Sequence, residues 1–173
     1  GRTPAREALV ILASEGLIDP IPRSGYLVTP ISIRDVLEVF HLRTVLEVEA
    51  VGLAVDRITE DDIRALEENN RREREVLAAQ RANPSSQSYR AGYELNSEFH
   101  LTVARASGNL RLASLVEQLL NEMERILARD PYIADPQQHV GILNGLRRRD
   151  RPAAQNAMRQ HLEDTKNRLL DRF

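Results

Sequence analysis

The 173-residue sequence contains no cysteine and no tryptophan, and only 4% of its residues are aromatic. Without cysteine the chain can form neither disulfides nor thiolate metal sites, so we expect a reducing, cytoplasmic setting. So few aromatic rings argue against stacking on single-stranded nucleic acid. Arg and Glu interrupt every apolar run well before the roughly 20 residues of a membrane span, so we expect no membrane partner.

The charges of the chain nearly cancel. It has 24 basic and 26 acidic side chains, which gives a formal net charge of −2. No global excess of positive charge favours nucleic acid, so any contact with DNA must come from a local patch. The 42% of hydrophobic residues is ordinary for a globular protein, and 173 residues suffice for one domain, or for one domain and a fragment.

Helix-start signals divide residues 31–173 into six expected helices. Ser32 followed by Asp35, and Thr59 followed by Asp62, resemble capping boxes, in which a hydroxyl and a carboxylate satisfy the first free N–H groups. The expected helices span about residues 32–56, 59–81, 89–107, 109–129, 135–149 and 150–173, with a linker at 83–88. Six helices with short joints predict an all-α, six-helix antiparallel bundle.

The first 30 residues have a different pattern. Thr3 and Pro4 predict a helix start, with Thr as the N-cap and Pro in the first turn. Two short β-type runs follow, at residues 17–18 and 26–29, and they flank a basic tip at 20–25 that contains glycine. One helix and one hairpin cannot bury a core alone. Either this piece leans on the bundle or the chain starts partway through a domain.

Three segments of this front piece resemble the GntR family of transcriptional regulators. Residues 2–9 (RTPAREAL), 15–18 (EGLI) and 23–26 (RSGY) are similar to the recognition helix and wing of its winged helix-turn-helix. The remainder resembles the FCD effector domain of the family's FadR-type branch, and six helices are typical of its VanR-like subgroup. The resemblance implies that residues 1–30 are the C-terminal part of a winged-helix domain and that residues 31–173 are the effector domain.

The resemblance also places particular residues on double-stranded operator DNA. These are Arg2, Thr3 and Arg6 on the recognition helix, with Ser24 and Gly25 at the tip of the wing. Arg2 and Arg6 share one helical face, and Arg makes bidentate contacts to guanine in the major groove. An isolated Arg pair is more often a solvated face, but the surrounding motif favours DNA contact. Because such readers bind two half-sites, we expect a homodimer.

Three of the four histidines fall where one shared site could form. His100 follows Asn96 by four residues, so both lie on one helical face. His139 lies eleven residues before the turn at Asp150 and His161 lies eleven after it. Each is therefore roughly 16 Å from the turn, at equal height in an antiparallel helix pair. The spacing leaves open whether they bind one metal ion or are unrelated core histidines, each with its own partner.

The family resemblance favours the metal. Metal-binding FCD domains carry Asp or Asn, then His four residues later, then two more His separated as they are here. This implies that Asn96, His100, His139 and His161 are ligands of a divalent ion, namely zinc, with nickel or iron as alternatives because imidazole suits all three. Asn96 stands where Asp is usual, and a neutral amide oxygen is a weaker ligand than a carboxylate.

Arg43 interrupts an apolar helical stripe that runs from Val36 through Leu46 to Ala50. One interpretation is that its stem packs while its charged head reaches solvent. The other is a clamp for a carboxylate ligand, since guanidinium meets carboxylate bidentately. FadR-type regulators generally sense small organic acids, so the resemblance implies a small carboxylate effector held by Arg43 beside the metal.

Two other functions compete with that of a ligand-responsive regulator. A metal-dependent enzyme would need a general base, and no carboxylate in a pattern such as His-Glu-x-x-His accompanies the histidines, so we expect no enzyme. A helical interaction bundle in which the metal is only a structural staple remains open.

Overall fold

The computed structural model describes residues 1–14, 16–83, 86–127 and 135–172. They divide into two compact units, one up to Ser32 and one from Ile33 onward, which are described separately below. No helix among these residues has both the length and the apolar character that crossing a membrane requires.

The first unit is one helix and one hairpin. Helix α1 (Arg2–Ser14) contacts strand β1 (Ile18–Ile21), which pairs antiparallel with β2 (Gly25–Val28). Gly16 follows the helix with φ +70°, a left-handed conformation that glycine adopts without the strain of a side chain. The predicted helix and hairpin are both present.

Two details of the predicted first unit are wrong. The helix begins at Arg2, so Thr3 lies inside its first turn and is not the N-cap. Strand β1 also extends further than expected, to Ile21, and β2 begins one residue earlier, at Gly25, which pairs with Ile21. Only residues 22–24 remain at the tip.

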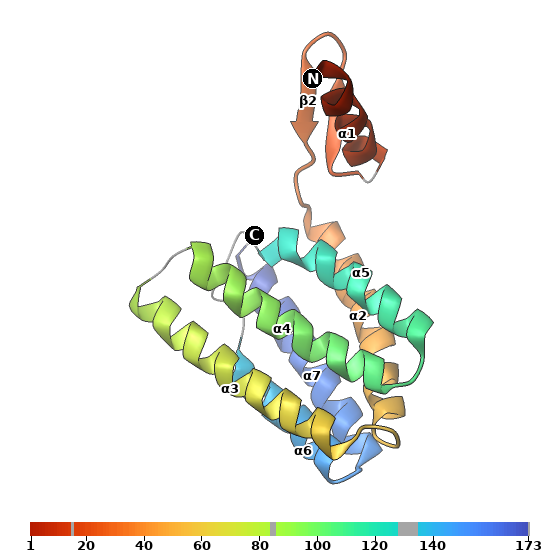
Figure 1. The fold of residues 1–173 in the computed structure, drawn as a ribbon, viewed down its shortest axis with the longest axis vertical. Coiled ribbons are helices and arrows are strands. Elements are labelled where there is room, and N and C mark those ends of the chain that lie inside the picture. Colours follow the sequence, from red (N-terminus) through yellow and green to blue (C-terminus); the bar gives the residue numbers. More distant parts are fainter. Residues whose placement is uncertain (15, 84–85, 128–134, 173) are drawn as a thin grey trace. The chain divides into compact units, whose positions relative to one another are not determined.

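The second unit confirms the predicted six-helix bundle. Its helices are α2 (Ile33–Ala54), α3 (Glu60–Ala82), α4 (Ser86–Ala106), α5 (Leu110–Leu127), α6 (His139–Arg147) and α7 (Arg151–Leu170). In Figure 1, α3, α4 and α5 lie side by side with α6, α7 and α2 behind them, and contacts between α3 and α6 and between α2 and α5 join the two layers. The predicted capping box of Thr59 and Asp62 is present at the start of α3.

Two helix boundaries differ from the prediction. Helix α4 begins at Ser86, so residues 86–88 of the predicted linker are helical, and residues 84–85 lie outside the described part. Pro136 opens a short 3-10 turn, η1 (Pro136–Gln138), and the α-helix starts only at His139. The predicted end of the fourth bundle helix, before residue 130, also lies outside the described residues.

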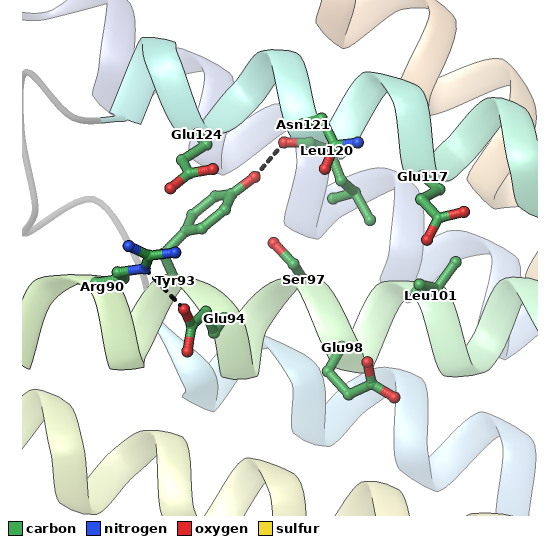
Figure 2. Close-up of a pocket in the computed structure, with 10 residues that line it drawn as sticks. All are labelled: Arg90, Tyr93, Glu94, Ser97, Glu98, Leu101, Glu117, Leu120, Asn121 and Glu124. Carbon is green, nitrogen blue, oxygen red and sulfur yellow. Dashed lines mark hydrogen bonds and ion pairs between the residues drawn. The ribbon is translucent and has the colours of Figure 1, made fainter.

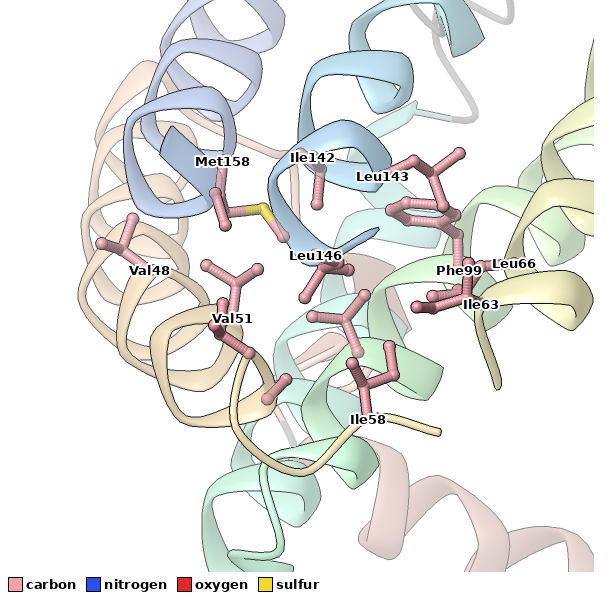
Figure 3. Close-up of a cluster of buried hydrophobic side chains, with 14 of the residues drawn as sticks. Val48, Val51, Ile58, Ile63, Leu66, Phe99, Ile142, Leu143, Leu146 and Met158 are labelled. Carbon is pink, nitrogen blue, oxygen red and sulfur yellow. The ribbon is translucent and has the colours of Figure 1, made fainter. Parts of the chain in front are cut away.

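The hydrophobic core joins the helices that carry the histidines. Phe99 of α4, Ile142 and Leu146 of α6, and Met158 of α7 are fully buried in one cluster (Figure 3). Helices α6 and α7 approach closely at Gly145, where a Cβ atom would lie 2.6 Å from the backbone nitrogen of Ala154. Burying each such side chain stabilises the fold by about 1.5–3 kcal/mol, so the histidine-bearing helices are held on a rigid base.

Candidate metal and effector site

Three imidazoles meet in the interior of the bundle. His100 comes from α4, His139 from the start of α6 and His161 from α7, and all three are buried. Each offers a ring nitrogen within 4.8 Å of the others. The ring centroids of His139 and His161 are 4.7 Å apart, so the two residues at equal height in the helix pair face each other.

The proton on His100 is positioned by a carboxylate. Nδ1 of His100 lies 2.5 Å from Oε2 of Glu47, which is buried on α2. The other carboxylate oxygen of Glu47 accepts a hydrogen bond of 2.6 Å from Nε of Arg43. Because an ionised carboxylate only accepts, Nδ1 of His100 carries the hydrogen and Nε2 presents a lone pair.

An amide performs the same task for His161. Nδ1 of His161 lies 3.1 Å from Oε1 of Gln138. The amide is oriented from outside, since its Nε2 donates to Asp164 and its Oε1 accepts from Arg168. Nδ1 of His161 is therefore the donor, and its Nε2 also presents a lone pair.

The two lone pairs converge. Nε2 of His100 and Nε2 of His161 are 3.1 Å apart, and in these tautomers neither can donate a hydrogen to the other. A cation bound by both nitrogens removes the repulsion. Two nitrogens bound to one tetrahedral zinc at about 2.0–2.1 Å lie roughly 3.3 Å apart, so the observed spacing fits such an ion. The outer oxygens match the acceptors that usually orient metal-bound histidines.

His139 and Asn96 complete the cluster. The ring of His139 stacks on Phe99 with centroids 4.0 Å apart, and its Nε2 lies 3.4 Å from Nδ2 of Asn96. Asn96 Nδ2 also donates to Oε1 of Glu73, at 3.2 Å. Glu73 Oε2 lies 3.2 Å from Nδ1 of His139, an ion-pair distance without hydrogen-bond geometry. All four predicted ligand residues are thus adjacent, although Asn96 presents its nitrogen to His139.

The electrostatics of the site favour the neutral form of His100 and His161 and the ionised form of Glu47. Burial lowers the pKa of His100, against the opposing attraction of Glu47. Burial is also the largest cause that lowers the pKa of His161 well below its ordinary value, and the cations Arg43 and Arg168 add to it. For Glu47, burial opposes ionisation but Arg43 and His100 outweigh it and lower the pKa to about 2. Neutral imidazole is the form that binds metal.

Arg43 lies inside the bundle. Its side chain is buried, with the guanidinium 5.6 Å from the ring centroid of Phe40, so the interpretation that its head reaches solvent is wrong. Its Nε is committed to Glu47, whereas Nη2 has no hydrogen-bond partner among the described residues. A carboxylate ligand can therefore meet Nη2, whereas Nε is already used by Glu47.

Sequence reasoning missed the residues that orient the histidines. Glu47 lies four residues after Arg43 on the same helical face, a spacing that signals an ion pair. Glu73 lies seven residues after the buried Leu66, so it shares the apolar face of α3. A charged residue on a core-facing stripe was the available signal in both cases. Gln138, at the 3-10 turn, carried no such signal.

A hollow lies between α4 and α5, and its lining contains none of the three histidines (Figure 2). Tyr93 reaches across it and donates a hydrogen bond to the carbonyl of Leu120, and Arg90 pairs with Glu94 at 2.9 Å. Its rim is predominantly acidic, which is a poor match for a carboxylate ligand.

The residues predicted to contact DNA lie in the first unit. Thr3 and Arg6 are exposed on α1, and Ser24 and Gly25 are exposed at the hairpin. The side chain of Arg2 lies outside the described part of the structure.

Comparisons with known proteins define the class of this chain. The FCD domain family matches residues 38–164. The chain belongs to the GntR family of transcriptional regulators with an FCD domain, which are not enzymes.

Individual relatives agree with that class. The chain is similar to the HTH-type transcriptional repressor RspR of Escherichia coli K12, at 27% identity covering 94% of this chain and 71% of RspR. It is 30% identical to the Uxu operon regulator of Haemophilus influenzae, covering 98% of this chain and 68% of that protein. Its fold is similar to E. coli McbR/YncC, with a TM-score of 0.78, 23% identity and coverage of 99% and 85%.

The buried carboxylate of Glu47 generates a pH-dependent prediction. Its pKa is lowered from 4.5 to about 2, so its ionised form contributes stability that is present above pH 4.5 and lost as the pH falls toward 2. We expect Glu47→Gln to destabilise the protein at neutral pH by about 3–5 kcal/mol, because Arg43 loses its partner. We also expect a flatter decline in the free energy of unfolding between about pH 5 and pH 3 than in the wild type.

Urea unfolding at a series of pH values measures both effects. Glu38→Gln is the control, because it removes a carboxylate of the same helix whose ion pair with Arg34 is exposed. This control should follow the wild-type profile. Parallel profiles for the wild type and Glu47→Gln would contradict the assignment.

Proposed function

We propose that this GntR-family regulator is a homodimer that binds operator DNA, and that a small organic acid modulates it through a metal-containing pocket in the helical domain. The ligands are His100, His139 and His161, with Asn96 beside them. The observation that carries the proposal is the pair of Nε2 atoms 3.1 Å apart whose opposite ring nitrogens both face acceptor oxygens. When bound, a divalent ion such as zinc, or nickel or iron, supplies a positive centre for an anionic effector.

Arg43 connects such an effector to the metal site. Its free Nη2 is a donor for a carboxylate, and its Nε holds Glu47, which in turn holds His100. A ligand bound at Nη2 would therefore weaken or strengthen the hydrogen bonds from Arg43 to Glu47 and from His100 to Glu47, which orient His100. A structural staple would need the histidines but not a free guanidinium nitrogen.

Zinc should stabilise the metal-free protein. Binding only to the folded state at 100 times the Kd contributes about 2.7 kcal/mol, which raises the Tm of a domain of this size by roughly 5–10 °C. We expect His161→Ala to lose this zinc-dependent rise in a thermal melt. His41→Ala is the control, because His41 is exposed on α2 and should leave the rise intact. Equal rises in both variants would refute the site.

The same melts separate a sensor from a staple. Small mono- and dicarboxylates are added singly to the zinc-loaded and the chelator-treated protein. In a sensor, the acid that raises the Tm should lose its effect after chelation and in Arg43→Lys, which keeps a cation beside Glu47 but removes Nη2. A zinc-dependent rise with no response to any acid favours the staple.

DNA recognition by α1 can be tested at Arg6. Arg6→Ala should weaken specific operator binding by about 1–3 kcal/mol, the value of a bidentate contact to a base. Arg71→Ala is the control, because it removes an equal charge from an exposed position on α3. Fluorescence anisotropy at fixed salt measures the affinity, and unchanged binding of Arg6→Ala would mean that this helix does not read bases.

The exposed apolar side chains of α2 and α5 form the candidate dimer surface. On α5, Leu115 is 48% exposed, whereas Leu112 and Leu119 are 7% exposed and pack within the chain. The adjacent α2 leaves Leu42 and Val45 exposed by 49% and 56%. GntR-family regulators typically act as dimers, and these side chains form one apolar surface that could make that contact.

Replacing part of this surface should therefore give monomers. We expect Leu42→Glu combined with Val45→Glu to halve the mass seen by light scattering at micromolar concentration, because two carboxylates would enter an apolar interface. The control is Val140→Glu, which places a carboxylate at an exposed apolar position of α6, away from the α2 and α5 surface, and should leave the mass unchanged. A wild-type protein that is already monomeric would count against the dimer.

A further inference from the structure

Glu73 brings a negative charge into the bundle beside the histidines. Its side chain is fully buried on α3, where Oε1 accepts from Asn96 Nδ2 at 3.2 Å and Oε2 lies 3.2 Å from His139 Nδ1. Asn96 is uncharged. A neutral His139, the form that binds metal, supplies no charge to balance the carboxylate.

The other buried carboxylate of the site differs in this respect. Glu47 pairs with Arg43 at 2.6 Å, so those two charges cancel. Among the described residues, no Lys or Arg forms an ion pair with Glu73, and Oε2 has no hydrogen-bond donor. A buried, uncompensated carboxylate destabilises the folded protein. A divalent cation held by the neighbouring histidines would supply the missing positive charge.

Glu73 also determines which residue is compatible with position 96. A carboxylate only accepts hydrogen bonds, so Asn96 must direct Nδ2 toward Glu73. This orientation leaves Oδ1, the amide's possible metal ligand, directed away from Glu73. An aspartate at this position would instead face Glu73 with a second carboxylate at about the 3.2 Å of the present hydrogen bond.

We propose that Glu73, and not residue 96, provides the negative charge of the metal site, and that Asn96 is its obligatory neutral partner. This inference rests on the proposed metal-binding function. Glu73 acts through Asn96 and His139 and is therefore a positioning and charge-balancing residue. The arrangement predicts that one carboxylate supports zinc binding whether it stands at position 73 or at position 96. Carboxylates at both positions should repel each other and destabilise the metal-free protein.

Four proteins test this prediction: the wild type, E73Q, N96D and N96D/E73Q. Zinc affinity is measured by competition with a chromophoric chelator, and stability by the Tm of the metal-free protein. We expect E73Q to weaken zinc binding by about 10–100-fold, which is typical when a residue that orients a metal ligand is removed. We expect N96D/E73Q to recover most of that affinity. N96D alone should lower the metal-free Tm, and the same change in the E73Q background should lower it far less.

The control variant is E68Q, which removes an exposed carboxylate of α3 and should match the wild type in both measurements. The inference is overturned if E73Q binds zinc within about twofold of the wild type, or if N96D/E73Q binds no better than E73Q. If the wild type itself binds no zinc, the proposed function fails. If the wild type binds zinc through His161 and E73Q binds equally well, only the role of Glu73 fails.

Discussion

Two buried imidazole nitrogens, of His100 and His161, present lone pairs to each other across 3.1 Å, and a cation between them would relieve the repulsion. The surrounding structure maintains this condition. Glu47 and Gln138 fix the protons on the far side of the two rings, and Arg43 and Arg168 hold those two residues in turn. Each of these groups would be costly to bury alone, and each has at least one partner in the next residue of the network. The two branches of the network converge on the proposed cation site.

The bundle can carry such a network because a continuous apolar cluster lies against it. Phe99 belongs to that cluster and stacks on His139, so one ring belongs to the core and its neighbour to the site. Helices α2, α3, α4, α6 and α7 all contribute to the cluster, and each also contributes a residue to the polar network or its orientation. Packing that fixes the helices consequently fixes the ring positions, as a preorganised ligand site requires.

Much of this arrangement was predictable from local rules. Thr59 and Asp62 form the expected capping box, and equal spacing around the turn at Asp150 correctly placed His139 opposite His161. Their role as metal ligands remains a prediction. The partners Glu47 and Glu73 were not predictable in the same way, because helical spacing shows that a carboxylate faces inward but not what it meets across the bundle. That information arises only when helices distant in sequence pack together.

The predicted helix boundaries were wrong at two places where local sequence signals conflicted. Residues 86–88 have a composition typical of a linker, yet they form the first turn of α4, because the serines there are tolerated at a helix start. Pro136 was expected to start an α-helix and instead forms a 3-10 turn. That difference matters for the site, since Gln138 lies in the turn and orients His161.

The close approach of α6 and α7 at Gly145 has a consequence for how the domain holds itself together. The two helices form a local hairpin, and its histidines come together without closing a long loop. His100, by contrast, is 61 residues from His161 along the chain. An ion bound by all three histidines would act as a reversible cross-link that closes a loop of that length. The chain entropy lost on closing this loop has already been lost when the bundle folds. Without the ion the hairpin would stay closed by its own short turn, and α4 would be held by its packing against α2, α3 and α5.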